Sequence, residues 1–219
     1  MDFQRRFVLG LPQLDPLLDS FAEAFRSVYD LWDVPFANVM LTSALDCITA
    51  SCVETSIAPF KAANPPGRFP WFLRSRTGSA LVYCSMIFPK SGNHDFSAFF
   101  RAAPDMEYFS AVTNDLLSHV PLLICGDKIL IDDFLRFYKE SLANESDNYI
   151  HHRAHAEGKS PLQILSDVKG EIVIASENVM DVLTRFGGEA SVKAWEEWEF
   201  GFVYVRSLRC LYRTCQTLT

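Results

Sequence analysis

The residues of this chain that are best suited to chemistry form a motif of oxygen donors divided into two parts. The first part reads N-D-L-L-S at residues 114–118, and the second reads F-Y-K-E at residues 137–140. Without the 18 residues from 119 to 136, the two parts would join as N-D-L-L-S-F-Y-K-E. In that joined form the Asn, the Ser and the Glu recur every four residues, so one face of a helix would carry all three oxygens.

These oxygen donors predict a magnesium site. The amide oxygen of Asn114, the hydroxyl of Ser118 and the carboxylate of Glu140 are hard ligands. Such ligands suit a Mg²⁺ ion that keeps some of its waters and also holds a phosphate. Lys139 places a positive point charge beside them, as a bound diphosphate would need. We therefore expect Mg²⁺ as the cofactor.

The insert at residues 119–136 separates the ligands along the chain. It contains Pro121 and Gly126, and both residue types disfavour the interior of a helix. The first part of the motif is therefore expected to close one helix, while Lys139 and Glu140 lie on another. The three ligands converge only if the insert loops out and the two helices align.

An alternative reading keeps the spacing of four without removing any residue. It uses Asp132, Arg136 and Glu140, but a guanidinium then stands where the hydroxyl ligand belongs and would repel a cation. We favour the divided motif over this reading. The insert is apolar at first and acidic later, and we interpret it as translated intron sequence. Finding its codons at full abundance in the spliced transcript would contradict that interpretation.

Length and composition indicate one globular domain. The 219 residues are 49% hydrophobic and 21% charged, which allows a substantial core and excludes disorder. The net charge of −7, without any run of Lys or Arg, argues against nucleic acid as a partner. Six cysteines without a C-x-x-C pair indicate reduced, buried side chains in a cytoplasmic protein. We find neither a signal-peptide core nor an apolar stretch of 18 residues, so no membrane span is expected.

Apolar residues recur at helical spacing almost throughout, which predicts an all-α bundle. Helices are expected at residues 14–32, 35–56, 69–75, 79–88, 104–118, 132–142, 160–186 and 190–215, with a short helix within 144–155. Breaks are expected at Gly78 and at Gly187-Gly188. Because no repeat or linker divides the chain, residues 1–219 are expected to form a single domain.

Three stretches of the chain carry a resemblance to a known family. The first stretch begins with F-P-W-F-L-R-S-R-T-G at 69–78 and ends with I-F-P-K at 87–90. The second begins with P-D-M at 104–106 and ends with the first part of the motif. The third begins with the second part of the motif and continues to D-N-Y-I at 147–150 and R-A at 153–154. In content and order they resemble the fungal trichodiene-synthase-like terpene cyclases, a class I family. The resemblance covers nearly everything except the insert, and the joined N-D-x-x-S-x-x-x-E pattern is its most specific part.

The resemblance implies a fold and an activity. The fold is the all-α bundle of class I terpene synthases, and the activity is that of a carbon–oxygen lyase of fungal secondary metabolism. Such an enzyme uses Mg²⁺ to ionise an acyclic prenyl diphosphate, here most of all farnesyl diphosphate. It then cyclises the allylic cation in a pocket whose aromatic faces stabilise positive charge. A homodimer is one of the assemblies that the resemblance allows.

The resemblance also implies roles for individual residues. Asn114, Ser118 and Glu140 would bind one Mg²⁺, and Lys139 would contact the diphosphate. Arg74 matches the family's diphosphate-sensing arginine, four residues before a helix break whose backbone carbonyls can face the cation.

Near the C-terminus the family carries an Arg-Tyr pair that grips the diphosphate. Here Leu211 and Tyr212 match that pair. Leucine cannot donate a hydrogen bond to phosphate, so Arg209 or Arg213 would have to replace the arginine of the pair.

The chain departs from the family at its N-terminus. The family's first metal motif, which is rich in aspartate, would precede the region that matches residues 1–3, so we expect the chain to be the C-terminal two-thirds of the family domain. Asp15 and Asp19 have a similar spacing but match a helix downstream of that motif. We therefore expect this chain to turn over farnesyl diphosphate with Mg²⁺ poorly or not at all. A non-catalytic α-helical remnant or interaction protein with the same fold is an alternative. A prenyltransferase is a weaker one, because it would need two aspartate-rich motifs.

Overall fold

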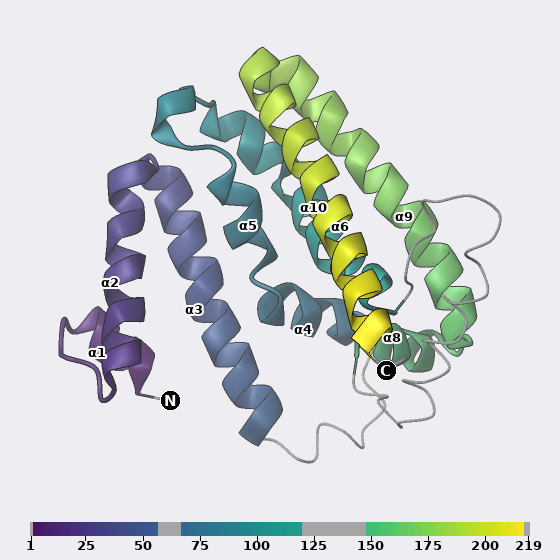
Figure 1. The fold of residues 1–219 in the computed structure, drawn as a ribbon, viewed down its shortest axis with the longest axis horizontal. Helices are drawn as coiled ribbons and strands as arrows, with labels where there is room; N and C mark the ends of the chain where they lie inside the picture. The colour runs from purple at the N-terminus through teal and green to yellow at the C-terminus, as the bar shows by residue number, and fades with distance from the viewer. Residues whose placement is uncertain (1, 57–66, 120–147, 217–219) are drawn as a thin grey trace.

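The computed structural model describes residues 2–56, 67–119 and 148–216, with side chains up to Val53, Leu116 and Val205 in the three ranges (Figure 1). As predicted, every regular element in these ranges is a helix. The α-helices are α1 (Phe3–Val8), α2 (Pro16–Leu31), α3 (Val34–Ser56), α4 (Phe69–Thr77), α5 (Ala80–Met86), α6 (Phe96–His119), α8 (Tyr149–Glu157), α9 (Pro161–Val182) and α10 (Gly188–Gln216). A 3₁₀ turn, η2 (Lys90–Gly92), and a π-helical segment, η3 (Leu183–Gly187), complete the order. The expected helix at residues 132–142 lies outside the described residues.

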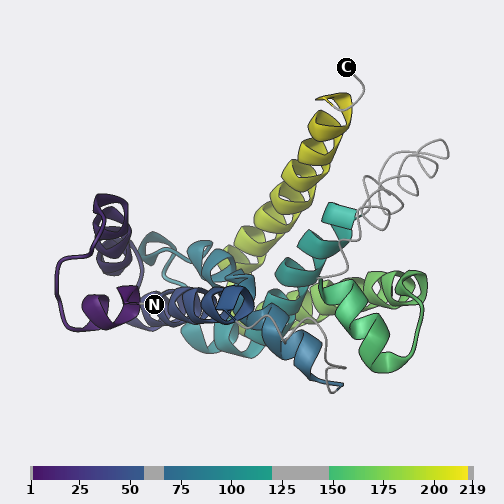
Figure 2. The ribbon, with the colours of Figure 1, turned by 90° about the horizontal axis from the view of Figure 1, so that it is seen from below.

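The helices are arranged around α6. The short pair α1 and α2 lies at one end of the molecule, and α8 and α9 lie at the other end (Figures 1 and 2). Helix α6 packs against α5 and α4 on one side and against α9 and α10 on the other. Figure 2 shows that the C-terminal part of α10 rises away from the rest of the bundle. The C-terminal turns of α6, which carry the first part of the motif, are therefore attached to a helix held from several sides.

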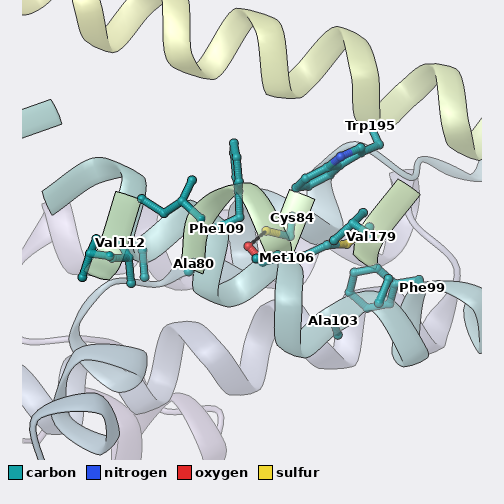
Figure 3. Close-up of a cluster of buried hydrophobic side chains, with 14 of the residues drawn as sticks. Ala80, Cys84, Phe99, Ala103, Met106, Phe109, Val112, Val179 and Trp195 are labelled. Carbon is teal, nitrogen blue, oxygen red and sulfur yellow. Dashed lines mark hydrogen bonds between the residues drawn. The ribbon is translucent and has the colours of Figure 1, made fainter. Parts of the chain in front are cut away.

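The core is built from the apolar faces of α6, α9 and α10. Met106 and Phe109 on α6 are buried, and the Trp195 ring of α10 lies 5.4 Å from the Phe109 ring, centroid to centroid, in a tilted edge contact (Figure 3). From α5, the fully buried Cys84 thiol donates to the Met106 carbonyl across 3.3 Å. These contacts fix the rotation of α6 about its axis and thereby decide which of its residues face α3 and α4.

Local caps explain where α2 and α9 begin. The Asp15 side chain accepts a hydrogen bond from the backbone N–H of Leu17, and Asp19 accepts one from the backbone N–H of Gln13. Ser160 caps α9 in a reciprocal pair of hydrogen bonds with Gln163. Both aspartates that have the spacing of a metal motif thus hold the start of a helix.

Helix α6 begins earlier than the sequence predicts. The expected start was at Pro104, since proline is favoured in a first turn, but the helix begins at Phe96 and Pro104 lies inside it. Asp95 accepts a hydrogen bond from the backbone N–H of Ser97 and starts the helix there. The side chains of Phe99 and its neighbours are buried, while Pro104 is exposed, so burial of the first turns outweighs the backbone hydrogen bond that proline cannot make.

The expectation that no long apolar stretch exists is wrong for α3. By length and composition, its segment Val34–Val53 could cross a membrane, with a mean hydropathy of 1.4 over its most apolar window. Core helices of globular proteins can be equally long and apolar, and α3 packs against α2, α4 and α5. It is the one such helix among the residues that could be searched.

The two predicted breaks are confirmed. Helix α4 ends at Thr77, and Ser79 adopts a left-handed conformation with φ of 46° before α5 begins. Gly188 has φ of +72°, which favours glycine, and it separates the π-helical segment from the axis of α10. The first of these breaks lies next to the candidate site.

Candidate functional site

Asn114 presents an unused oxygen near the end of α6. Its side-chain Oδ1 is buried and has no hydrogen-bond partner among the described residues. Buried polar atoms are nearly always paired, so an orphaned acceptor is open to a ligand from outside the protein chain or from its undescribed part. Gln13 Oε1, Thr113 Oγ1 and Trp195 Nε1 are orphaned in the same way, so this state alone does not identify a ligand. An amide oxygen in this state fits the role of a Mg²⁺ ligand that the sequence predicts for Asn114.

The other predicted ligands are described less fully. Ser118 lies on α6 one turn after Asn114, as the spacing of four requires, but its side chain lies outside what is described. Tyr212 lies on α10 with the same restriction. Lys139 and Glu140, and the alternative set that begins at Asp132, fall outside the described residues. Within the described part, no group of three His, Cys, Asp or Glu side chains is placed to hold a metal ion.

Arg74 is held against α6 beside Asn114. Its Nε donates to Oδ2 of Asp115 across 2.5 Å, and its Nη2 donates to Oδ1 of the same carboxylate across 2.8 Å and to the Ala111 carbonyl across 2.7 Å. The two side chains are only 13% and 14% exposed. A bidentate ion pair of this kind fixes both distance and orientation. The structure therefore brings together Arg74 and the first part of the motif, which lie about 40 positions apart in the chain.

The helix break after α4 makes room for this arginine. A Cβ atom on Gly78 would lie 2.2 Å from Nη1 of Arg74, so a side chain at position 78 would displace the guanidinium. Nη1 itself makes no hydrogen bond to any described residue, which leaves two N–H donors unused. From α3, the Cys47 thiol donates to the Thr77 carbonyl across 3.3 Å and ties the break to the bundle. Hydrogen bonds from Nε and Nη2 thus fix the position of the Arg74 guanidinium, while the N–H donors of Nη1 are unused.

Glu107 is a candidate residue that the sequence reading missed. It lies seven residues before Asn114, and residues seven apart on a helix share a face. Burial raises the pKa of its carboxyl to about 7, the neighbouring Arg76 opposes that rise and Asp46 adds to it. The signal that could have found it was the spacing of seven on a helix already identified as bearing the site.

A second, separate group surrounds Arg153. Its Nη1 and Nη2 donate to the two carboxylate oxygens of Glu171 across 2.6 and 2.7 Å, and its Nε donates to Glu157 across 2.6 Å. Tyr108 and Tyr149 contact the same guanidinium through their hydroxyls. Together with Trp71 these side chains line an open pocket of about 630 Å³ between α4, α6, α8 and α9.

The chain is similar in sequence to several known proteins. No family profile matches the chain. Terpene synthase BipA of Cochliobolus sativus is 28% identical over 204 residues, and longiborneol synthase of Gibberella zeae is 29% identical over 215 residues. Monoterpene synthase 25 of Postia placenta is 30% identical over 209 residues.

These matches cover 92%, 96% and 94% of the chain but only 57%, 58% and 56% of the respective relatives. The chain therefore spans somewhat more than half the length of the curated relatives that it matches. All three relatives are fungal terpene synthases, and the observed helices agree with the all-α class I terpene synthase fold. The chain is a terpene synthase-like protein, homologous to fungal terpene synthases over nearly its whole length.

Proposed function

We propose that the chain acts as a terpene cyclase of the trichodiene-synthase type, which binds an acyclic prenyl diphosphate with Mg²⁺, ionises it and cyclises the resulting cation. The observation that carries the proposal is the pairing of Arg74 with Asp115, the residue that follows Asn114 and its orphaned oxygen on α6. A cation ligand and an anion donor are thus neighbours, which is the combination that a metal-bound diphosphate requires.

Each residue has a defined task in this mechanism. Asn114, Ser118 and Glu140 would hold Mg²⁺, and the bound ion would neutralise charge on the departing diphosphate. Arg74 donates from Nη1 to a phosphate oxygen while Asp115 keeps the guanidinium oriented. Lys139 and Tyr212 add donors to the same group. When the carbon–oxygen bond breaks, the electron pair leaves with the diphosphate and an allylic cation remains.

The substrate chain length is part of the proposal. We favour farnesyl diphosphate because the motif order resembles a sesquiterpene cyclase family. The name of one relative, a monoterpene synthase, makes geranyl diphosphate the substrate to compare. Incubation of the chain with each substrate and Mg²⁺, followed by gas chromatography and mass spectrometry, should give cyclic products with farnesyl diphosphate above all.

Binding of Mg²⁺–pyrophosphate by calorimetry tests the site without requiring turnover. Asn114→Ala should weaken binding about tenfold, since a hydrogen bond or ligand contact to a charged group contributes about 1.5–3 kcal/mol. Asn178→Ala is the matched control, because Asn178 is exposed on α9 and pairs with Asp105. Equal affinity in both variants would contradict the proposed site and favour a non-catalytic interaction protein.

The divided motif predicts that deleting the insert raises the affinity for Mg²⁺–pyrophosphate. Removing residues 119–136 places Glu140 four positions after Ser118, so that α6 would carry all three ligands on one face. We expect this variant to bind Mg²⁺–pyrophosphate about tenfold more tightly than the parent, and Glu140→Gln should cancel the gain. Weaker binding after deletion would mean that the insert is a native part of the site.

A further inference from the structure

A small polar pocket lies among α3, α4, α5 and α6. Six of its seven lining residues carry hydroxyl or charged groups, and Leu81 is the exception: the six are Thr42, Ser43, Asp46, Ser75, Arg76 and Glu107. The volume of about 180 Å³ accommodates a few water molecules, each of which occupies about 30 Å³ in the liquid. This polar lining suits water, because a water molecule in a polar pocket finds the two to four hydrogen-bond partners that it needs.

The charges in the pocket leave Glu107 without a fixed partner. Arg76 forms an ion pair with Asp46, and Glu107 makes no hydrogen bond to any residue in the described part of the chain. The groups that face Glu107 are Asp46 from α3, Arg76 from α4 and the buried Cys84 from α5. Burial raises the pKa of Glu107 to about 7, which is the range in which a carboxylate accepts a proton efficiently at neutral pH.

The position of the pocket relates it to the proposed site. Glu107 precedes Asn114 by seven residues on the same face of α6, which corresponds to about 10 Å along the helix axis. For the two to act together, a hydrocarbon chain whose diphosphate is held at Asn114 has to extend along α6 towards Glu107. Leu81 lines the pocket from α5, and the pocket opens to solvent where the Arg76 and Asp46 side chains are 43% and 48% exposed.

We propose that this pocket is a water subsite and that Glu107 is the base that activates its water, so that the chain makes a terpene alcohol. The proposal rests on the function proposed above. In the step, the water oxygen bonds to the carbocation, and one O–H bond breaks. Its proton passes to the Glu107 carboxylate, which becomes a carboxylic acid, and a neutral alcohol is left.

The test uses the full chain with farnesyl diphosphate and Mg²⁺ in water enriched in ¹⁸O. The parent should release an alcohol that carries ¹⁸O. In Glu107→Gln the alcohol fraction of the products should fall at least about tenfold in favour of hydrocarbons, because a general base contributes about 10²–10⁴ to a rate. Glu177→Gln, an exposed change on α9, is the matched control and should keep the parent's product ratio.

Several outcomes would overturn the inference. Hydrocarbons alone from the parent, or an unchanged alcohol fraction in Glu107→Gln, would show that the pocket supplies no water to the cation. Loss of all products from Glu107→Gln with an unchanged thermal melt would place Glu107 in an earlier step. If the parent releases no pyrophosphate at all, the proposed function itself fails and this role of Glu107 fails with it.

A second measurement does not depend on turnover. Carbon-13 NMR of the chain labelled at glutamate carboxyls should show one resonance that titrates near pH 7 and is missing in Glu107→Gln. If Glu107 instead titrates near the ordinary value of 4.5, the carboxyl is not held in the pocket as described, and the inference is wrong.

Discussion

Two arginine–carboxylate pairs lie against the same side of α6 and differ in how their donors are used. Arg74 pairs with Asp115, and Arg153 pairs with Glu171 and also contacts Tyr108. Asp115 and Tyr108 are seven residues apart and therefore share a helix face. Both guanidiniums bind a carboxylate in a bidentate manner, and both are largely buried.

The difference lies at the remaining edge of each guanidinium. All three nitrogens of Arg153 donate to carboxylates or tyrosine hydroxyls, so no nitrogen of the group is without a partner, and we call Arg153 and Glu171 the saturated pair. Nη1 of Arg74 has no hydrogen-bond partner among the described residues, and glycine at position 78 leaves space beside it. The comparison teaches that a bidentate pair alone does not distinguish the two arginines. The unused donors of Arg74 do distinguish them, and they support the proposed contact with a diphosphate.

The largest expected effect is on stability at the saturated pair. Arg153→Met removes the guanidinium from Glu171 and Glu157, which keep only Tyr108 and Lys159 as partners. The free energy of unfolding should therefore fall by about 2–3 kcal/mol, measured by urea denaturation. Affinity for Mg²⁺–pyrophosphate should stay within about twofold of the parent's. A loss of affinity as large as that of an Arg74 variant would end the distinction between the two pairs.

The next largest effect is expected on the binding of Mg²⁺–pyrophosphate at the pair of Arg74 and Asp115. Arg74→Met should weaken binding of Mg²⁺–pyrophosphate about 30-fold, because a charge-assisted contact of about 2 kcal/mol is lost. Combining it with Asp115→Asn neutralises the buried carboxylate that faces Arg74, so stability should recover while affinity stays low. If affinity recovers as well, Arg74 contributes only to folding.

A smaller effect is expected at the helix break. Gly78→Ala should push the Arg74 guanidinium away from its place and weaken binding by about fivefold, roughly 1 kcal/mol. Because the displaced atoms are the end of a flexible side chain, the melting temperature should change little. Gly170→Ala on α9 meets no atom within 4 Å and serves as the control.

The smallest expected effect is on how the stability of the fold changes with pH at the saturated pair. The hydrogen bond from Arg153 lowers the pKa of Glu171 below its usual value of 4.5. The pair therefore stabilises the fold above pH 4.5, and this contribution is lost as pH falls through the lowered pKa. Denaturation between about pH 6 and about pH 3 should show a shallower loss of stability in Arg153→Met than in the parent. Parallel curves would mean that the pair contributes nothing at neutral pH.

Much of the fold could be predicted from apolar spacing and breakers. The ends of α2, α3 and α9 lie within a few residues of the predicted ones. Asp15 caps α2 just before Pro16, and Ser160 caps α9, so both starts are set locally. The start of α6 was missed because the burial of Phe99, a tertiary effect, outweighs the local preference of Pro104.

The site was predictable only where one helix carries it. The spacing of Asn114 and Ser118 placed both on α6 directly, and the resemblance indicated Arg74. The partner of Arg74 could not be read from the sequence, because the contact with Asp115 depends on how α4 packs against α6. Glu107 escaped notice for a similar reason: its environment comes from three other helices.

The glycine beside Arg74 also bears on how the protein can evolve. Its close approach to Nη1 makes substitution at position 78 harmful only while an arginine occupies position 74. The two positions are therefore epistatic, and the order of substitutions matters. A lineage that first loses Arg74 is released from the constraint on Gly78, whereas a lineage that retains the arginine must retain the glycine, so the pair should be lost together when selection on diphosphate binding ends.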